Sequence, residues 1–242
     1  MTRNMPILTS LSAGWQGLTH LFYPDLCVAC GGELPGPEDS FCYPCRLKLE
    51  PTYMYRDAEN PFTDRFWGRL SLQSATALYY FARKSPVQKA LHALKYRNRP
   101  EIGFRLGRAL GRHLRNAPHA AGVDVIVPVP LHPGKERQRG YNQSLWFARG
   151  LESELPSSRI NPQALMRLTN TGSQTRRRRM ERYQNVSGSF ALRSAAGLQG
   201  KHVLLVDDVM TTGATLETCG RLLLDIPVGA LSLATIAFAV HQ

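Results

Sequence analysis

Apolar runs and polar connections alternate along the second half of the chain in a pattern typical of strands and helices that follow one another. The predicted strands cover about residues 74–81, 124–129, 163–167, 202–206 and 230–238. Stretches with apolar residues three and four positions apart lie between these strands and predict helices. Such alternation implies a parallel sheet with helices on both faces, so we expect an α/β domain over residues 76–242.

The most informative local pattern comes where the strand predicted at residues 202–206 ends. Asp207 and Asp208 follow this run, and a small loop then passes directly into a helical pattern. The loop consists of Thr211, Thr212, Gly213, Ala214 and Thr215. Its backbone N–H groups can surround a phosphate, which the dipole of the following helix also favours. Two carboxylates at the carboxyl end of a parallel strand can accept hydrogen bonds from sugar hydroxyls. We therefore expect a site for a phosphorylated sugar rather than an ordinary turn with a helix cap.

Four of the five cysteines form two CxxC pairs. Cys27 and Cys30 make the first pair, and Cys42 and Cys45 make the second after eleven intervening residues. Two pairs at this separation supply four thiolates for a tetrahedral zinc site, and an all-sulfur site leaves no position open for water. Unliganded cysteines are the alternative. We expect a structural zinc in a small module within residues 1–50, which depends on its metal to fold.

The regions beside the cysteines have weaker patterns. Residues 8–22 place apolar side chains on one face of a helix, which favours a helix docked on the rest of the protein over a membrane-surface or partner helix. Residues 51–75 contain Pro51 and Pro61 with scattered aromatic side chains, and we expect a linker there.

Composition and charge narrow the function classes. The chain has 30 Lys and Arg against 18 Asp and Glu, a net charge of +12, which predicts polyanionic partners. No run of eighteen apolar residues occurs and the first residues lack a secretory pattern, so we expect no membrane span and a cytoplasmic location. The GxGxxG, GxxxxGK[ST] and HExxH motifs are absent, which removes dinucleotide, P-loop and zinc-protease functions.

Residues 203–215, VLLVDDVMTTGAT, resemble the phosphoribosyl pyrophosphate (PRPP) loop of type I phosphoribosyltransferases. Met210 is the one soft departure, because that family usually has a branched aliphatic residue there. The resemblance implies that residues 211–215 hold the 5-phosphate and that Asp207 and Asp208, as the catalytic acids, hold the ribose hydroxyls. It also implies a magnesium ion that bridges those hydroxyls and the pyrophosphate.

A second string, PVPLHP followed by RQRGYNQ, is similar to the ComF family of phosphoribosyltransferase-like proteins, named for DNA-uptake competence. Gln174 and Thr175, residues 180–186 and the four-cysteine module agree with this family pattern. The resemblance covers nearly the whole chain and is weakest at residues 50–75. It implies a sheet of the type I phosphoribosyltransferase kind, with Pro130 and Arg139 facing the pyrophosphate.

The connection around residues 167–193 is unusually rich in arginine. Its central cations are Arg176, Arg177, Arg178, Arg179 and Arg182. Long polar loops in compact domains tend to be functional lids or disordered segments. The resemblance implies a flexible loop that closes over PRPP, and a loop that contacts nucleic-acid phosphates is the alternative.

Two functions from different classes remain open. The favoured one is an enzyme that transfers phosphoribose from PRPP to an acceptor, linked to DNA uptake and to other DNA-uptake proteins. The alternative is a non-enzymatic competence factor that binds single-stranded DNA and uses PRPP as a ligand or signal. Single-strand binding requires cations interleaved with exposed aromatic side chains, and Tyr96, Tyr141 and Tyr183 each lie near arginines.

Overall fold

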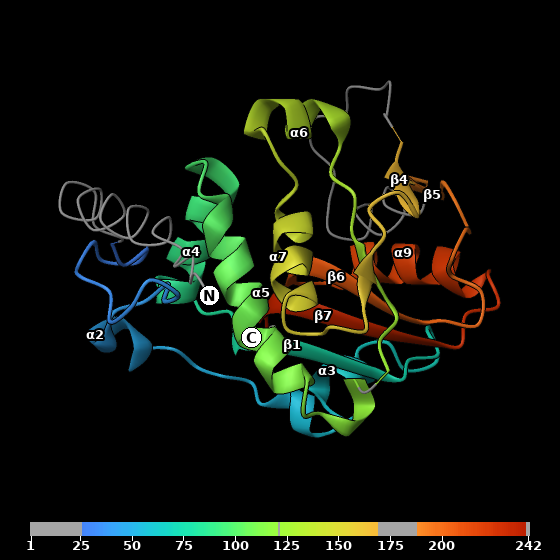
Figure 1. Cartoon of the computed structure of the whole chain (residues 1–242), viewed down its shortest axis with the longest axis horizontal. Coiled ribbons are helices and arrows are strands. Elements are labelled where there is room, and N and C mark those ends of the chain that lie inside the picture. The colour runs from blue at the N-terminus through green and yellow to red at the C-terminus, as the bar shows by residue number, and fades with distance from the viewer. Residues whose placement is uncertain (1–25, 121, 169–187, 241–242) are drawn as a thin grey trace, which may run out of the picture.

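The protein folds around one parallel sheet, seen in a computed structural model that describes residues 26–120, 122–168 and 188–240 (Figure 1). The strand order is β1-β7-β6-β2-β3, and every neighbouring pair is parallel. The strands are β1 (Ser74–Tyr80), β2 (Val125–Pro128), β3 (Arg159–Ile160), β6 (His202–Met210) and β7 (Ala230–Phe238). The predicted α/β fold with a parallel sheet is confirmed.

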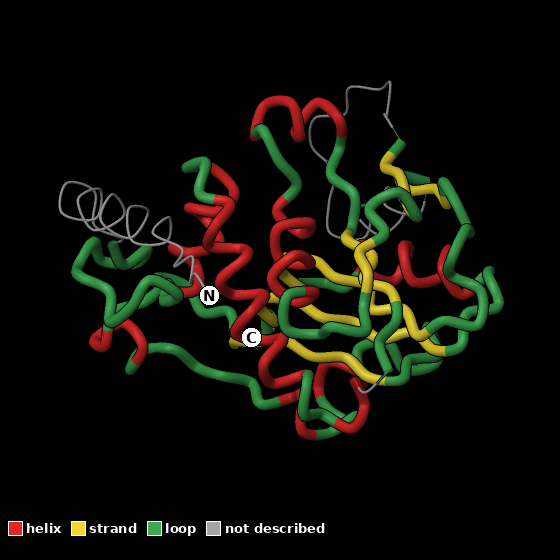
Figure 2. The backbone as a smooth tube through the Cα atoms, in the orientation of Figure 1, coloured by secondary structure: helices red, strands yellow, loops and turns green. Residues whose placement is uncertain are grey.

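Alternate side chains of the central strands enter two separate cores. Leu204 and Val206 of β6 pack with residues of α4 (Pro86–Tyr96), α5 (Pro100–Leu114) and α7 (Gln143–Glu152). Val203 and Leu205 pack instead with α3 (Pro61–Asp64) and α9 (Ala214–Leu224). Helices therefore cover both faces of the sheet, which explains why the strands appear in the sequence as continuous apolar runs (Figure 2).

Helices α5 and α7 pack backbone against backbone. A Cβ atom at Gly107 of α5 would lie 2.2 Å from the carbonyl oxygen of Phe147, and one at Gly150 would lie 2.1 Å from the carbonyl oxygen of Phe104. No side chain fits between helices at this distance, so glycine is required at both positions. The contact fixes α7 against the sheet and, with it, the start of α7 beside the end of β6.

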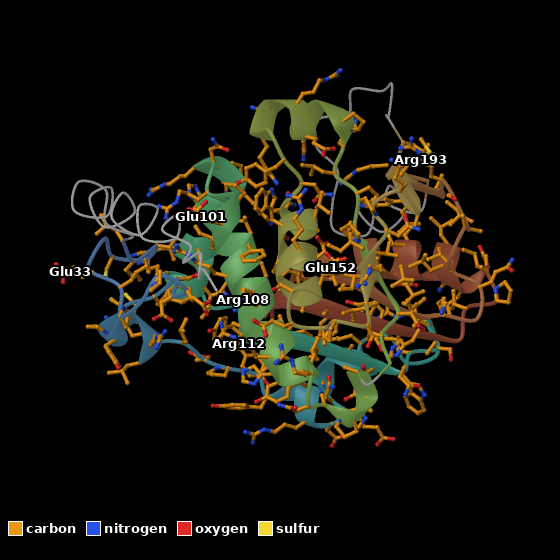
Figure 3. The ribbon with its side chains drawn as sticks, viewed as in Figure 1. Glu33, Glu101, Arg108, Arg112, Glu152 and Arg193 are labelled. Atoms are coloured by element: carbon orange, nitrogen blue, oxygen red, sulfur yellow. The ribbon has the colours of Figure 1, made fainter. Side chains whose placement is uncertain are left out.

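The cysteine segment is docked on this helical layer. It contains the short helix α2 (Tyr43–Arg46), and Cys27, Cys42 and Cys45 share one buried cluster with residues of α4 and α5. Arg108 of α5 forms ion pairs with both Glu38 and Glu154, and the guanidinium of Arg112 lies 2.8 Å from Glu38. Figure 3 labels both arginines on α5. Apolar packing and ion pairs therefore both attach the cysteine segment to α5.

The segment at residues 51–75 is part of the core, contrary to the expected linker. It forms the 3-10 helix η1 (Met54–Arg56) and then α3. Asn60 caps α3 by accepting from two backbone N–H groups, and its amide donates to the carbonyl of Ala75 at 2.9 Å. Phe62 and Phe66 are fully buried. Both aromatic side chains belong to the core on this face of the sheet, so the segment is packed and not a free connection. The division into domains at residues 50 and 75 stays a prediction.

Two strand predictions need correction. The strand expected at 163–167 lies outside the parallel sheet, where β4 (Leu165–Arg167) pairs antiparallel with β5 (Phe190–Leu192). A strand of three residues is paired by whichever partner tertiary folding brings beside it. The strand expected at 202–206 runs on to Met210, so the two acids lie within β6 and not after it. Asp208 is only 3% exposed, and the acids therefore belong to the packed structure.

Other predictions fall on residues that are not described. These are the helix at 8–22 and the arginine-rich loop with Arg176, Arg177, Arg178, Arg179 and Arg182. Among the described residues, no helix is long and apolar enough to cross a membrane. The remaining short elements are η2 (Pro118–Ala120) and α6 (Pro133–Arg139).

Candidate functional site

The loop after β6 forms the amino-terminal end of α9. Gly213 is the residue before the helix and has φ +82°, in the left-handed region that glycine adopts without strain. No side chain caps α9 from this position. Thr211 and Thr212 are exposed, while Gly213 and Ala214 are buried. The first N–H groups of α9 therefore have no cap from Gly213, as an anion site at a helix amino terminus requires.

A small cavity of about 30 Å³ joins this loop to the acids. It is lined by Asp207, Val209, Met210, Thr211, Thr212, Gly213, Ala214, Thr215 and Leu216. All five loop residues expected at a phosphate and one of the two expected acids thus face one space. Its size suits a single tetrahedral anion rather than a whole nucleotide.

Asp207 and Asp208 lie where β6 loses its neighbour on one side. β2 ends at Pro128, which pairs with Val206, while β7 continues to pair with β6 through Met210. Asp207 is therefore the first residue of β6 beyond the end of β2. This is the edge of an open parallel sheet at which ligands bind.

Each acid has a partner from a distant element. Ser144 at the start of α7 donates its hydroxyl to Asp207 at 2.9 Å, and the backbone N–H of Asp208 donates to the same carboxylate at 2.8 Å. The ammonium of Lys95, in the last turn of α4, lies 3.0 Å from a carboxylate oxygen of Asp208. Burial raises the pKa of Asp207 to about 7, and the charge of Asp208 adds to this effect. Asp207 therefore takes up a proton near neutral pH, while Lys95 balances the charge of Asp208.

The loop after β2 holds the start of α7 in place. The amide of Asn142 donates to the carbonyl of Val129 at 3.0 Å, and its oxygen accepts from the N–H of Ser144 at 2.9 Å. Pro130 follows Val129 directly and is half-buried. Arg139 ends α6, where its guanidinium donates to Gln143. Asn142 and Ser144 belong to the sequence string RGYNQS, but nothing in that string indicates that Ser144 meets Asp207.

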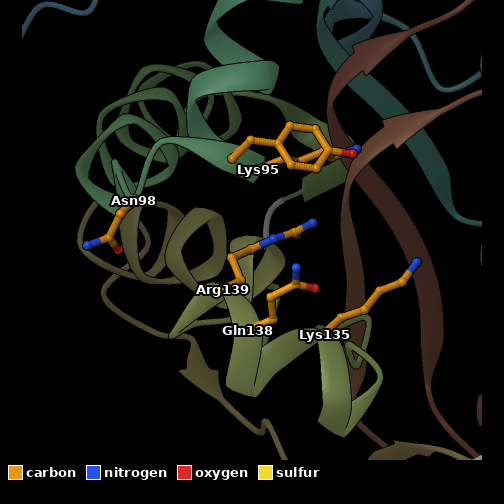
Figure 4. Close-up of a pocket in the computed structure, with 6 residues that line it drawn as sticks. Lys95, Asn98, Lys135, Gln138 and Arg139 are labelled. Carbon is orange, nitrogen blue, oxygen red and sulfur yellow. The ribbon is translucent and has the colours of Figure 1, made fainter.

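A second cavity, of about 260 Å³, lies between the end of α4 and α6 (Figure 4). It is lined by Lys95, Tyr96, Asn98, Lys135, Gln138 and Arg139. Lys95 belongs both to this cavity and to the ion pair with Asp208, so the cavity adjoins the acid pair. Arg139 is the predicted pyrophosphate residue found here. Lys95 belongs to the basic and aromatic stretch of residues 94–97, for which binding and a solvated face were equally expected, and Lys135 was not assigned to the site.

The four cysteines meet as expected for a metal centre. The Sγ atoms of Cys27, Cys30, Cys42 and Cys45 all lie within 4.8 Å of one another. Four ligands about 2.3 Å from a tetrahedral zinc would be separated by similar distances. Three of the four side chains are buried, and the N–H of Gly32 donates to the sulfur of Cys30 at 3.4 Å. The donor set and its spacing fit a structural zinc ion.

The carboxyl-terminal part of the chain matches a known protein family. Residues 144–241 match the family described as "Phosphoribosyl transferase domain". Competence protein F of Haemophilus influenzae is 26% identical over 227 residues, which cover 90% of this chain and 99% of that protein. Competence protein ComFC of Bacillus subtilis is 26% identical over 78% of this chain and 80% of its own length.

Two further matches cover a smaller part of this chain. The DNA utilization protein YhgH of Escherichia coli O6:H1 is 33% identical over 142 residues, 57% of this chain and 61% of that protein, so the match spans under two thirds of its length. Among solved structures, a hypoxanthine phosphoribosyltransferase from Staphylococcus aureus covers 56% of this chain and 62% of that chain, with a TM-score of 0.35 and 17% identity. So weak a likeness decides nothing about this chain.

Proposed function

We propose that this chain, which is similar to two competence proteins and matches the phosphoribosyl transferase domain over residues 144–241, binds PRPP at residues 207–215. We further propose that it transfers the phosphoribosyl group to an acceptor in a process linked to DNA uptake. One observation carries the proposal: a glycine with positive φ opens α9 directly beside two acids at the end of β2, and the hydroxyl of Thr212 accepts from the first N–H of that helix at 3.4 Å.

The 5-phosphate of PRPP would bind the cavity formed by residues 211–215. The backbone N–H groups at the start of α9 donate to it, and the hydroxyls of Thr211, Thr212 and Thr215 add side-chain donors. Since backbone groups supply most of this binding, Thr212→Ala should weaken it by only about 1 kcal/mol.

The ribose hydroxyls would lie against Asp207 and Asp208. Ser144 donates to Asp207 and the ammonium of Lys95 lies 3.0 Å from Asp208, whose buried Oδ2 accepts no hydrogen bond from the described residues. A sugar hydroxyl is a donor like the hydroxyl of Ser144, so the acids can accept both. Their charge strengthens each hydrogen bond and also favours positive charge that develops on the neighbouring sugar carbon.

The pyrophosphate would extend from the acids toward Pro130 and Arg139. Magnesium, when bound with PRPP, neutralises the pyrophosphate and keeps mainly water and substrate oxygens as ligands. The protein's own task is to hold the leaving group with Arg139, to orient the sugar with the acids and to exclude water.

Calorimetry tests the site assignment. The wild type should bind PRPP in the presence of magnesium, and Asp207→Asn combined with Asp208→Asn should weaken binding at least about 100-fold, since two charge-assisted hydrogen bonds of roughly 1.5–3 kcal/mol each are lost. Asp225→Asn is the matched control, because Asp225 is exposed at the far end of α9. Equal binding by the double variant and the control would rule the assignment out.

Pyrophosphate release then tests transfer itself. PRPP and magnesium are incubated with the protein, with and without nucleobases, nucleotides or DNA, and the released pyrophosphate is measured. Release that depends on one of these acceptors supports the enzyme.

The second candidate function is a non-enzymatic factor that binds single-stranded DNA and uses PRPP as a ligand. Exposed aromatic rings beside arginines favour it: Arg139 lies 5.7 Å from the ring of Tyr96, and Arg56 lies 4.5 Å from that of Tyr53. Tyr141 does not contribute, because it is buried and its hydroxyl donates to the carbonyl of Leu94. PRPP binding and DNA binding without any pyrophosphate release would favour this function over transfer.

A further inference from the structure

The cavity between α4 and α6 has a composition that PRPP alone does not explain. We propose that it binds a phosphorylated nucleoside unit, as a free mononucleotide or as the phosphorylated end of a strand. This nucleotide is the second ligand of the site, bound beside PRPP. The inference deepens the proposed function and rests on it for the position of PRPP.

Charge selects an anion for this cavity. Lys95, Lys135 and Arg139 are three of its six lining residues, and none of the described residues that line it is acidic. The nearest acid in contact is Asp208, which already pairs with Lys95. A neutral nucleobase or nucleoside brings no charge to balance these cations, whereas a phosphate group would pair with them.

The other three lining residues, Tyr96, Asn98 and Gln138, have side chains that can contact a nucleobase. Tyr96 is 69% exposed, although it lies in the last turn of a packed helix. Its ring has the guanidinium of Arg139 at 5.7 Å and the imidazole of His92 at 4.9 Å. An exposed aromatic face flanked by a cation is the surface on which bases stack.

Asn98 and Gln138 supply hydrogen-bonding groups beside this ring. Each amide side chain offers both a donor and an acceptor, the pair of groups that a base edge presents in return. Asn98 has φ +50°, a left-handed conformation that asparagine adopts more readily than most residues. It lies in the turn of only a few residues between α4 and α5, so its position beside Tyr96 is fixed by both helices.

The volume of the cavity between α4 and α6 limits the ligand to one nucleotide. About 260 Å³ lies just under the range of roughly 300–1,000 Å³ for small-molecule sites. It is far larger than the 30 Å³ cavity at the start of α9. Inorganic pyrophosphate alone would use the cations and leave the aromatic face and both amides unused.

Measurement after saturation with PRPP and magnesium separates this inference from the proposed function, because AMP carries the 5-phosphoribosyl group that residues 207–215 would otherwise hold. Calorimetry on the full chain would compare AMP with adenosine, adenine, inorganic pyrophosphate and a short 5′-phosphorylated oligonucleotide. We expect AMP or the oligonucleotide to bind at least about tenfold more tightly than adenosine, because only they carry the phosphate. Tighter binding by the oligonucleotide identifies a strand end as the natural ligand, and equal or tighter binding by AMP identifies a free nucleotide.

Variants then locate the binding. Tyr96→Leu should weaken AMP binding about tenfold, as expected for the loss of one stacked base, and Tyr96→Phe should restore it. Tyr43→Leu is the matched control, since Tyr43 is also 69% exposed but lies on α2. Lys135→Gln should weaken AMP binding without changing the binding of adenosine, whereas Lys48→Gln, an exposed lysine after α2, should change neither.

Three results would overturn the inference. These are AMP binding no tighter than adenosine, equal effects of Tyr96→Leu and Tyr43→Leu, and pyrophosphate binding that displaces AMP while every Tyr96 variant behaves as the wild type. Magnesium-dependent PRPP binding is measured in the same samples. If Tyr96→Leu retains it, a failure at the cavity is distinguished from a failure of the PRPP site.

Discussion

Replacing Gly213 by alanine tests how the loop before α9 is held. A Cβ atom at this position would lie 2.9 Å from Cζ of Phe66, closer than such atoms approach in proteins. Phe66 is fully buried, so its ring cannot move aside freely. The backbone at Gly213 also has φ +82°, where any other residue is strained. The left-handed conformation costs about 1–2 kcal/mol and the overpacking about 1–3 kcal/mol, which together make roughly 2–5 kcal/mol.

Thermal unfolding measures this loss. For a chain of 242 residues each kcal/mol lowers Tm by about 2–4 °C, so Gly213→Ala should lower Tm by roughly 10 °C. Gly197→Ala is the matched control, because Gly197 has φ +75° and open space at its Cβ position. This variant should lower Tm by about 4 °C, which is the effect of the left-handed backbone alone.

A double-mutant cycle separates the two causes. In a Phe66→Leu background the shorter side chain removes the ring atoms that meet the new Cβ, so Gly213→Ala should cost less there than in the wild type. The reasoning is refuted if both glycine variants lower Tm equally, or if the penalty at Gly213 is the same in both backgrounds.

Three further predictions concern the metal, the acids and the charge. Metal analysis of protein purified without chelator should find one zinc per chain. Cys42→Ser should release this zinc and unfold the amino-terminal segment while the sheet remains folded. Four free thiols and no zinc in the wild type would contradict the prediction. Because the pKa of Asp207 is raised to about 7, the unfolded chain deprotonates first and stability falls as pH rises from about 4 to 7. Denaturant unfolding should therefore show that Asp207→Asn gains stability relative to the wild type through that window, and a constant difference would count against it. Binding to single-stranded DNA should weaken about 10²- to 10³-fold between roughly 50 and 200 mM salt if about five phosphates are neutralised, and changing Arg176 through Arg179 to Gln should flatten that slope.

The local part of the site was predictable from the sequence. An apolar run, two acids and a hydroxyl-rich loop with one glycine are consecutive in residues 203–215, and the structure arranges them as strand, acids and helix amino terminus. The two CxxC pairs were equally informative, since their spacing alone brings four sulfur atoms within reach of one another. Such features depend on neighbours along the chain, which the sequence displays directly.

The partners of these residues were not predictable. Lys95 and Ser144 meet the acids from two helices that come earlier in the chain. The basic and aromatic stretch at residues 94–97 indicates binding as readily as a solvated face, but nothing around either residue indicates contact with the acids. Phe66 likewise lies in a segment without a clear period, yet its ring packs where Gly213 leaves room for it.

The sequence by itself indicated most of the strands and helices, the strand-to-helix loop at residues 203–215 and the two cysteine pairs whose thiols lie together. Only the tertiary structure decided that β4 leaves the main sheet, that residues 51–75 pack into the core and that a basic cavity adjoins the acids. The physical reason is the distance along the chain over which each kind of interaction acts. Periodicity and turn chemistry act over a few residues, whereas pairing, burial and electrostatic contacts depend on which distant segments the closed core brings together.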